Sequence, residues 1–269
     1  MLLKSIILNG TVIKQEEYTE KSIEFYEVIR VKDRALLFLQ DHIKRLNHSL
    51  KMANINKTFT IGAIQSYFAK LFEVDGIKNQ NVKISVNFEN DHVTCALYYI
   101  ESIYLQEDTY KKGVQVKTKS FERENPEIKQ RTTEMQTIRK QLQLDSVYEY
   151  LLVDREGLIL EGTKTNVFFV KGSQVITADT RKVLGGITRQ HVADLARVHS
   201  DFKELSFAKL NLKEVEAVFL TGTSIGILPV CKVDNISFNS ANNPVVLSLI
   251  KAYETWENTY IETHQLQDD

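Results

Sequence analysis

The segment LILEGTKTNVFFV, residues 158–170, contains two apolar runs separated by a short polar turn. Aliphatic, aromatic and β-branched residues make each run typical of a buried strand, and Gly162 with the polar residues after it is typical of a turn. Glu161 ends the first run, where an unpaired carboxylate would be costly to bury. The segment predicts two strands with Glu161 either at a ligand site or at the start of a turn that Gly162 closes.

The rest of the second half has the same pattern of strands joined by tight turns. Residues 166–179 predict a hairpin with its turn at 171–173, and a long last helix is expected from about Pro244. This pattern disfavours a doubly wound parallel sheet and favours a barrel-like domain. Further strands are predicted at 147–154, 215–222 and 226–234.

The first half mixes strand and helix signals, which predicts an α+β unit. Apolar residues recur at helical spacing in 39–55 and 60–74, and residues 81–101 alternate as in a hairpin around Glu89, Asn90 and Asp91. We expect a smaller N-terminal α+β domain, 1–118, and a larger C-terminal cofactor-binding domain of barrel-like α/β structure, 119–269. Two more strands are predicted at 2–10 and 22–31, and a helix at 132–144 after a polar connection.

Composition excludes several classes of protein. Lys and Arg total 34 and Asp and Glu total 35, so neither nucleic acid nor an acidic membrane is expected as the main partner. The first 14 residues do not resemble a signal peptide and no window is apolar enough to span a membrane, so we expect a cytoplasmic protein. Cys95, Cys231 and the six histidines match no metal-site spacing, and we expect free thiols and no metal.

The segment LGGITRQHVADLAR, residues 184–197, predicts a helix that begins after two glycines. Thr188 could cap the helix, and Gly185 and Gly186 would let the backbone approach a ligand. A helix N-terminus offers unpaired N–H groups and the positive end of the dipole, which favour a phosphate. The alternative is an ordinary glycine-containing loop with a helix cap.

The segment FLTGTSIGILP, residues 219–229, places the hydroxyls of Thr221, Thr223 and Ser224 after a buried strand, where they could also bind an anion. Residues 222–226 match the G-x-S-x-G pattern of serine hydrolases. That pattern requires a strand, a sharp turn and a helix, with the acid and the histidine later in the chain. Here a strand-like segment follows instead, so a hydrolase is not favoured.

Taken in order, these segments resemble a known family, the class-IV (fold-type IV) pyridoxal-phosphate enzymes. The family contains branched-chain and D-amino-acid aminotransferases and 4-amino-4-deoxychorismate lyase. The resemblance extends over nearly the whole chain and implies a two-domain fold, pyridoxal 5′-phosphate as cofactor and a homodimer. The residues that carry it are LEGTKTNVFFV (160–170), LGGITR (184–189), TGTSIGILPV (221–230), FYEVIR (25–30) and LFLQDHIKRLNHSL (37–50).

The resemblance also implies roles for individual residues. Lys129, in PEIKQRTTEMQ, matches the catalytic lysine that holds the cofactor covalently, with Lys140 as a second choice. Glu161 matches the carboxylate that keeps the pyridine nitrogen protonated, and Tyr26 matches a position on the substrate side, although it could equally be core. The phosphate is expected to bind Arg45, Gly186, Ile187, Thr188 and Thr223.

The implied activity is transfer of an amino group between a small amino acid, of branched-chain or D-amino-acid type, and a 2-oxo acid. The alternatives are a lyase that forms 4-aminobenzoate and pyruvate, and a non-catalytic protein that binds the cofactor. The chain departs from the family pattern in several places. Among them, Thr132 replaces a common asparagine, and Val86 and Asn87 occupy the strand that often carries a substrate-binding arginine. By vicinity alone, the candidates for that role are Arg30, Arg123 and Arg131.

Overall fold

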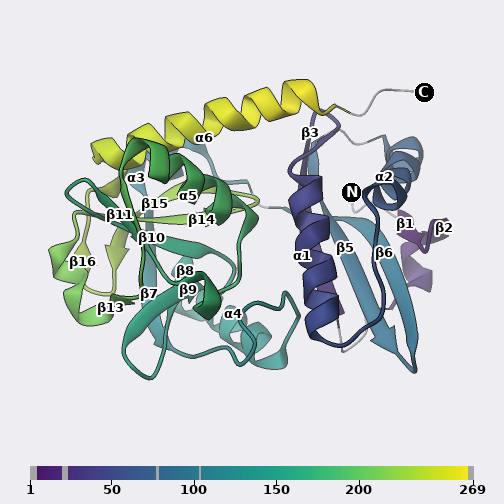
Figure 1. The fold of residues 1–269 in the computed structure, drawn as a ribbon, viewed down its shortest axis with the longest axis horizontal. Coiled ribbons are helices and arrows are strands. Elements are labelled where there is room, and N and C mark those ends of the chain that lie inside the picture. Colours follow the sequence, from purple (N-terminus) through teal and green to yellow (C-terminus); the bar gives the residue numbers. More distant parts are fainter. Residues whose placement is uncertain (1–4, 20–23, 77–78, 103, 266–269) are drawn as a thin grey trace. The chain divides into compact units, whose positions relative to one another are not determined.

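The computed structural model describes residues 5–19, 24–76, 79–102 and 104–265 (Figure 1). The first residues of the strands predicted at 2–10 and 22–31 lie outside these ranges. The chain forms two compact units, each described here by itself. Within the described residues, no helix is long and apolar enough to cross a membrane. Unit 1 comprises Met1–Ile103, Ile128–Thr132 and Glu257–Asp269, and unit 2 comprises Tyr104–Glu127 and Thr133–Trp256.

Unit 1 is built on an antiparallel sheet with the strand order β2-β1-β6-β5-β3-β4. The predicted hairpin is present as β5 and β6, and Asn90 and Asp91 turn it with φ of 50° and 62°. Short polar side chains of this kind tolerate positive φ, which such a tight turn requires. The strands are β1 (Ser5–Leu8), β2 (Thr11–Lys14), β3 (Glu24–Lys32), β4 (Ala35–Leu36), β5 (Gln80–Glu89) and β6 (His92–Ile100).

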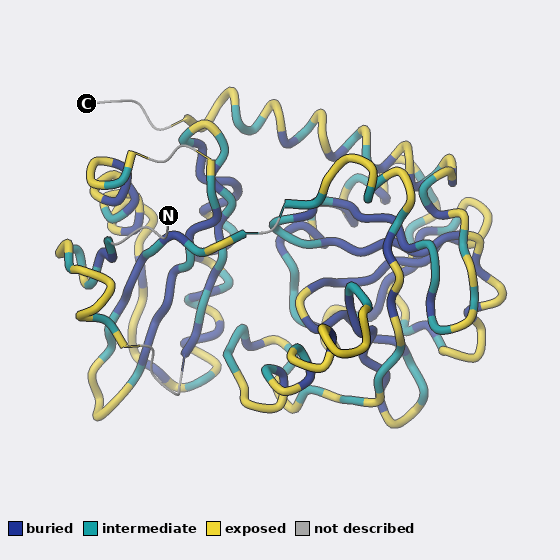
Figure 2. The backbone as a smooth tube through the Cα atoms, turned by 180° about the vertical axis from the view of Figure 1, so that it is seen from behind, coloured by how far each residue is buried: buried dark blue, intermediate teal, exposed yellow. Residues whose placement is uncertain are grey.

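Two helices pack their apolar faces on this sheet, α1 (Leu39–Met52) and α2 (Ile61–Asp75). The hydroxyl of Thr60 caps α2 by accepting a hydrogen bond from the N–H of Ala63 at 3.2 Å, and Gly76 ends it with φ of 64°. The core lies between helices and sheet, and the strands β3 and β5 are buried along most of their length (Figure 2). A short 3₁₀ helix, η1 (Gln15–Glu17), follows β2.

Unit 2 contains a closed ring of strands with the order β10-β14-β15-β7-β8-β9, in which β9 pairs with β10. Most pairs are antiparallel, but β7 runs parallel to both β8 and β15. The predicted barrel-like α/β fold of the second half is therefore confirmed. The ring strands are β7 (Val114–Ser120), β8 (Glu149–Val153), β9 (Leu158–Gly162), β10 (Asn166–Lys171), β14 (Ala217–Gly222) and β15 (Gly226–Val233).

Large side chains fill the core of unit 2, with Phe169, Val218 and Leu228 fully buried. Further strands extend the sheet beyond the ring: β11 (Gln174–Thr177), β12 (Asp201–Glu204), β13 (Phe207–Ala208) and β16 (Ile236–Ser237). The helices are α3 (Glu107–Lys112), α4 (Thr133–Asp145), α5 (Ile187–His199), α6 (Pro244–Thr263) and the 3₁₀ turns η2 (Thr180–Lys182), η3 (Lys209–Glu214) and η4 (Ser240–Asn242).

The domain boundary expected from the sequence, at 118/119, falls inside β7. The compact units also exchange short pieces of chain, because residues 128–132 and the end of α6 belong to unit 1. The division into domains 1–118 and 119–269 stays a prediction.

Candidate active site

The predicted site residues of unit 2 gather at one end of the strand ring. Strand register places Asn166, the first residue of β10, opposite both Glu161 of β9 and Thr221 of β14. Thr223 follows in the turn between β14 and β15. Glu161, Thr221 and Thr223 thus belong to neighbouring strand ends.

The carboxylate of Glu161 is buried, with 4% of the residue exposed, and both of its oxygens accept hydrogen bonds. Its Oε2 accepts a hydrogen bond from the N–H of Leu184 at 3.1 Å, and its Oε1 accepts one from Nη1 of Arg123 at 3.0 Å. These donors offset the cost of burying the charge. Arg123, a candidate for the substrate carboxylate, instead holds Glu161.

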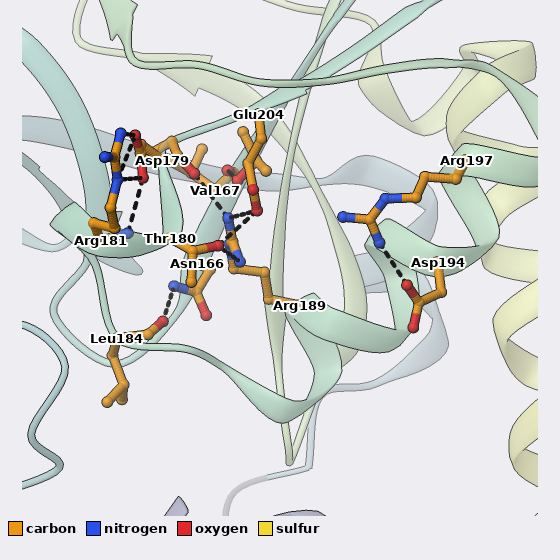
Figure 3. A network of polar contacts seen from close by, with 12 residues as sticks. Asn166, Val167, Asp179, Thr180, Arg181, Leu184, Arg189, Asp194, Arg197 and Glu204 are labelled. Carbon is orange, nitrogen blue, oxygen red and sulfur yellow. Dashed lines mark hydrogen bonds and ion pairs between the residues drawn. The ribbon is translucent and has the colours of Figure 1, made fainter. Parts of the chain in front are cut away.

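Helix α5 begins at Ile187, with Gly186 as its N-cap, and its first turn is fixed against neighbouring loops (Figure 3). Nδ2 of Asn166 donates to the carbonyl of Leu184 at 3.0 Å, and the buried Arg189 bonds Ala178 O at 2.7 Å. The prediction that Thr188 caps the helix is wrong: Thr188 lies within the first turn, and no side-chain hydrogen bond caps this end.

Position 186 requires a glycine, because the side chain of Asn166 leaves no room for a β-carbon there. A β-carbon on Gly186 would lie 2.0 Å from Oδ1 of Asn166, whereas one on Gly185 would meet nothing within 4 Å. The N–H of Gln190 bonds Gly186 O, so the N–H groups of residues 187–189 have no acceptor inside the helix. Backbone and dipole together make this end suitable for an anion.

Thr221 and Thr223 supply hydroxyls at the same end of the ring. Thr221 is 1% exposed, and its Oγ1 has no hydrogen-bond partner among the described residues. A buried hydroxyl without a partner costs free energy unless a ligand or water satisfies it. The N–H groups of residues 187–189, at the start of α5, and the Thr221 hydroxyl are hydrogen-bond donors, and this set fits a phosphate group.

The turn after Glu161 is organised by Glu149 of β8, a residue that the sequence analysis did not single out. Glu149 is fully buried, and its Oε1 accepts hydrogen bonds from the N–H and Oγ1 of Thr163 at 3.0 and 2.6 Å. Its Oε2 accepts from the N–H of Lys164 at 3.2 Å and from Oγ1 of Thr165 at 3.1 Å. A glutamate inside the apolar run 147–154 was the available signal.

In unit 1, Lys129 lies along the first residues of β3. The N–H of Tyr26 donates to Lys129 O at 3.2 Å, and the N–H of Lys129 donates to Oγ of Ser49 on α1 at 3.2 Å. Nζ of Lys129 lies 4.9 Å from the centroid of the Tyr26 ring. The structure therefore brings the predicted lysine and the predicted substrate-side tyrosine together. Lys140 is exposed on α4.

Arg45 of α1 bonds the buried carboxylate of Glu27 on β3, and Glu27 also bonds the buried His42 of α1. Nε and Nη2 of Arg45 donate to the two oxygens of Glu27 at 2.7 and 2.6 Å, and Nδ1 of His42 lies 2.7 Å from Oε2. Burial alone would raise the pKa of Glu27, but Arg45 and His42 lower it to about 2. Neither Glu27 nor His42 was singled out from the sequence.

Burial also acts on His42, and it lowers the pKa of this imidazole below its usual value. The hydrogen bond to Glu27 opposes this effect, and the charges of Arg45 and Lys129 add to it. His42 is therefore neutral at neutral pH, while Glu27 carries the charge that pairs with Arg45.

The functions disfavoured by the sequence find no support in these geometries. Ser224 lies in a turn between two antiparallel strands, and the element directly after it is strand β15 and not the helix that a serine hydrolase requires. Among the described residues, no three His, Cys, Asp or Glu side chains are grouped to hold a metal. Cys95 is buried and Cys231 half-buried, and both are free thiols.

The profile of the amino-transferase class IV family matches residues 24–233. A D-alanine aminotransferase of Bacillus licheniformis is 25% identical over 256 residues, covering 87% of this chain and 90% of that protein. An aminodeoxychorismate lyase of Bacillus subtilis is 23% identical over 256 residues, covering 86% and 85%.

The fold is shared with a T.th. branched-chain amino acid aminotransferase, solved with pyridoxamine 5′-phosphate. The TM-score is 0.84 at 20% identity, with 97% of this chain and 96% of that chain covered. This likeness agrees with the predicted two-domain fold-type IV architecture, and the match to the class IV family agrees with the predicted pyridoxal-phosphate cofactor. Because the family match at residues 24–233 spans most of its length, the chain belongs to the amino-transferase class IV family and is an enzyme.

Proposed function

We propose that the chain is a pyridoxal-phosphate-dependent aminotransferase that moves an amino group between a small amino acid, of branched-chain or D-amino-acid type, and a 2-oxo acid. The observation that carries the proposal is the arrangement at the ring end of unit 2. There the Glu161 carboxylate bonds the backbone of the loop that leads directly into the Gly186 cradle and the α5 N-terminus. A ligand with both a ring nitrogen and a phosphate suits this pairing of groups.

The residues proposed to hold the cofactor have distinct tasks. Lys129 would bind it covalently, the Glu161 carboxylate would keep its pyridine nitrogen protonated, and Tyr26 would line the substrate side. The phosphate is proposed to bind Arg45, Gly186, Ile187, Thr188 and Thr223.

When bound, pyridoxal phosphate draws electrons away from the Cα–H bond of the amino acid attached to it. Nζ of Lys129 would serve as the general base and acid, taking the proton from Cα of the amino acid and returning it to the cofactor side. The Glu161 carboxylate, fixed by Leu184 N–H and Arg123, keeps a proton on the pyridine nitrogen. In the net reaction, the first amino acid would become a 2-oxo acid and a second 2-oxo acid would become an amino acid. The water consumed in releasing the first oxo acid would be returned when the second one reacts.

The experiment compares Lys129→Ala with Lys140→Ala in protein loaded with pyridoxal phosphate. We expect Lys129→Ala to lose both the absorbance of the covalently bound cofactor and the transfer of amino groups from a panel of L- and D-amino acids. Lys140→Ala, on the exposed face of α4, should retain both. Retention of both properties by Lys129→Ala would refute the assignment of the lysine.

A lyase is the second candidate, supported by the aminodeoxychorismate lyase among the relatives. Aminodeoxychorismate and the amino-acid panel distinguish the two reactions. An aminotransferase converts the bound cofactor to its amine form when an amino acid is added. A lyase releases 4-aminobenzoate and pyruvate without that conversion, and reaction with neither substrate would refute both proposals.

The homodimer is a further proposal from the family resemblance. Size-exclusion chromatography with light scattering tests it, since the chain mass is 31.0 kDa. The cytoplasmic location stays a prediction from the sequence.

A further inference from the structure

One face of the unit 1 sheet carries charged and polar side chains close to Lys129. Along β3, Phe25 and Glu27 point toward the helices, so Glu24 and Tyr26 point to the opposite face. Strand register places Ser85 of β5 opposite Tyr26. We call this the Tyr26 face: Glu24, Tyr26, Lys83, Ser85, Asn87, Lys129 and Arg131.

The segment 128–132 adds two basic side chains to the Tyr26 face. Gln130 bridges to Phe25, so its neighbours Lys129 and Arg131 point to the other side. The contacts agree with this alternation, because Nζ of Lys129 lies 4.9 Å from the Tyr26 ring centroid and Nε of Arg131 lies 3.2 Å from Oε2 of Glu24.

Lys83 of β5 completes the group. Its Nζ lies 2.6 Å from Oε1 of Glu24 and 5.5 Å from the Tyr26 ring centroid, and its side chain is 13% exposed. The amines of Lys83 and Lys129 therefore both lie close to the ring of Tyr26. An amino acid whose amine takes the place of Lys129 Nζ on the cofactor would lie beside the ring that Lys83 also borders.

The position of the Lys83 ammonium is fixed through Glu24, which is fully buried. Oγ of Ser85 donates to Oε1 of Glu24 at 2.5 Å, and the hydroxyl of Tyr18 donates to Ser85 Oγ at 3.1 Å. Nδ2 of Asn87 in turn donates to the Tyr18 hydroxyl at 2.9 Å. This chain of hydrogen bonds orients the Glu24 carboxylate, which makes Glu24 a positioning residue for Lys83.

In the family, the strand that corresponds to β5 often carries a substrate-binding arginine. Here Val86 and Asn87 stand at that place, and neither can bind a carboxylate by charge. Val86 is fully buried in the apolar core under the helices, and Asn87 carries no charge. Lys83 lies on the same strand and points to the Tyr26 face. We propose that Lys83 binds the carboxylate of the substrate, in the role that an arginine often takes.

This inference rests on the proposed function and adds to it a rule for substrates. An ammonium is a point charge with three donors, and it binds a carboxylate by charge-assisted hydrogen bonds. The enzyme therefore takes amino acids in preference to amines that have the same side chain but lack the carboxylate, and Lys83 is the source of that preference.

The test uses holoenzyme with two substrate pairs, L-leucine with isoamylamine and D-alanine with ethylamine. Binding is followed by the spectral change of the bound cofactor, and turnover by the 2-oxo acid formed from the amino acids. The variants are Lys83→Met, which removes the charge, Lys83→Arg, which keeps it, and Lys32→Met as a control. Lys32 is also a strand lysine of unit 1 paired with a glutamate, Glu257.

We expect Lys83→Met to raise KM and the spectral Kd for the reactive amino acid about ten-fold or more, the effect of losing a charge-assisted hydrogen bond, with kcat much less affected. Amine binding should not change, Lys83→Arg should restore most of the amino-acid affinity, and Lys32→Met should match the wild type.

Equal amino-acid affinity in Lys83→Met and wild type would overturn the role of Lys83 and leave the proposed function standing. An equal loss of affinity for amino acids and amines would also overturn it, because the defect would then be structural. A wild-type protein that binds no pyridoxal phosphate would overturn the proposed function and this inference together.

Discussion

A β-carbon added to Gly186 would lie 2.0 Å from Oδ1 of Asn166, a distance that no real contact allows. Asn166 is the first residue of β10 and also bonds the Leu184 carbonyl, so it has little freedom to move away. The backbone of the α5 N-terminus is therefore held against β10 only because residue 186 has no side chain.

Gly186→Ala should weaken pyridoxal-phosphate binding by about ten-fold or more, because the loop must shift and misplace the N–H groups offered to the phosphate. Titration of the apoprotein, followed by absorbance, measures the Kd. Gly185→Ala is the matched control, since its β-carbon meets nothing within 4 Å. Similar affinities for the two variants would contradict a role for the Gly186 cradle.

Glu161→Gln should keep the cofactor bound but lower kcat by about a hundred-fold or more, because an amide cannot hold a proton on the pyridine nitrogen. The variant keeps the shape of the side chain and an oxygen that can accept from Leu184 N–H. Absorbance checks cofactor loading and single-turnover kinetics gives the rate. Unchanged turnover would remove Glu161 from the mechanism.

Glu149→Gln should lower the free energy of unfolding by about 3 kcal/mol, because an amide NH₂ would replace one of two oxygens that accept buried hydrogen bonds. The loop 163–165 should also loosen, and cofactor affinity should fall with it. Urea denaturation measures the stability. Glu216→Gln is the control, since Glu216 accepts a backbone N–H on the exposed surface. Equal stability losses would argue against the anchoring role of Glu149.

His42 should make the protein less stable in mild acid. Its pKa is lowered in the folded protein, so the unfolded chain binds a proton first as the pH falls below about 6.5. Between pH 7.5 and 5, the wild type should lose about 1 kcal/mol more unfolding free energy than His42→Gln, measured by urea denaturation. The exposed His199→Gln should behave as the wild type, and parallel pH profiles for all three proteins would contradict the expectation.

Below pH 5, protonation of Glu27 should lower the free energy of unfolding further. Its pKa is lowered to about 2, so its contribution to stability is complete above the usual carboxyl pKa and is lost as the pH falls from 4.5 toward 2.

The sequence predicted the parts of the fold that local pattern determines. The hairpin at Asn90 and Asp91 follows from alternation and turn residues, and the strand ending at Glu161 follows from its apolar run. The helix α5 was predicted correctly, but its cap residue was not. Thr188 is of a residue type that often caps helices, yet it is the second residue of the helix, and Gly186 occupies the N-cap position.

Contacts between distant residues could not be predicted in this way. Glu149 bonds a turn that lies a full strand later in the chain, and nothing in the spacing of VYEYLLVD indicates that the turn folds back on it. The same holds for Lys83 and Glu24, whose meeting depends on the register of β3 and β5. Glu27 looked like an ordinary strand residue because its partners lie on α1.

The ring of strands in unit 2 is closed where Glu161 of β9 pairs with Asn166 of β10. Glu161 is a proposed cofactor-binding residue, and Asn166 contacts another, Gly186. A seam formed at one pair is easier to open than the longer ladders around the rest of the ring. The cofactor is proposed to bind at Glu161 on one strand of this pair and at the α5 N-terminus, which Asn166 of the other strand holds. Binding there should stabilise the closed barrel against opening at this pair.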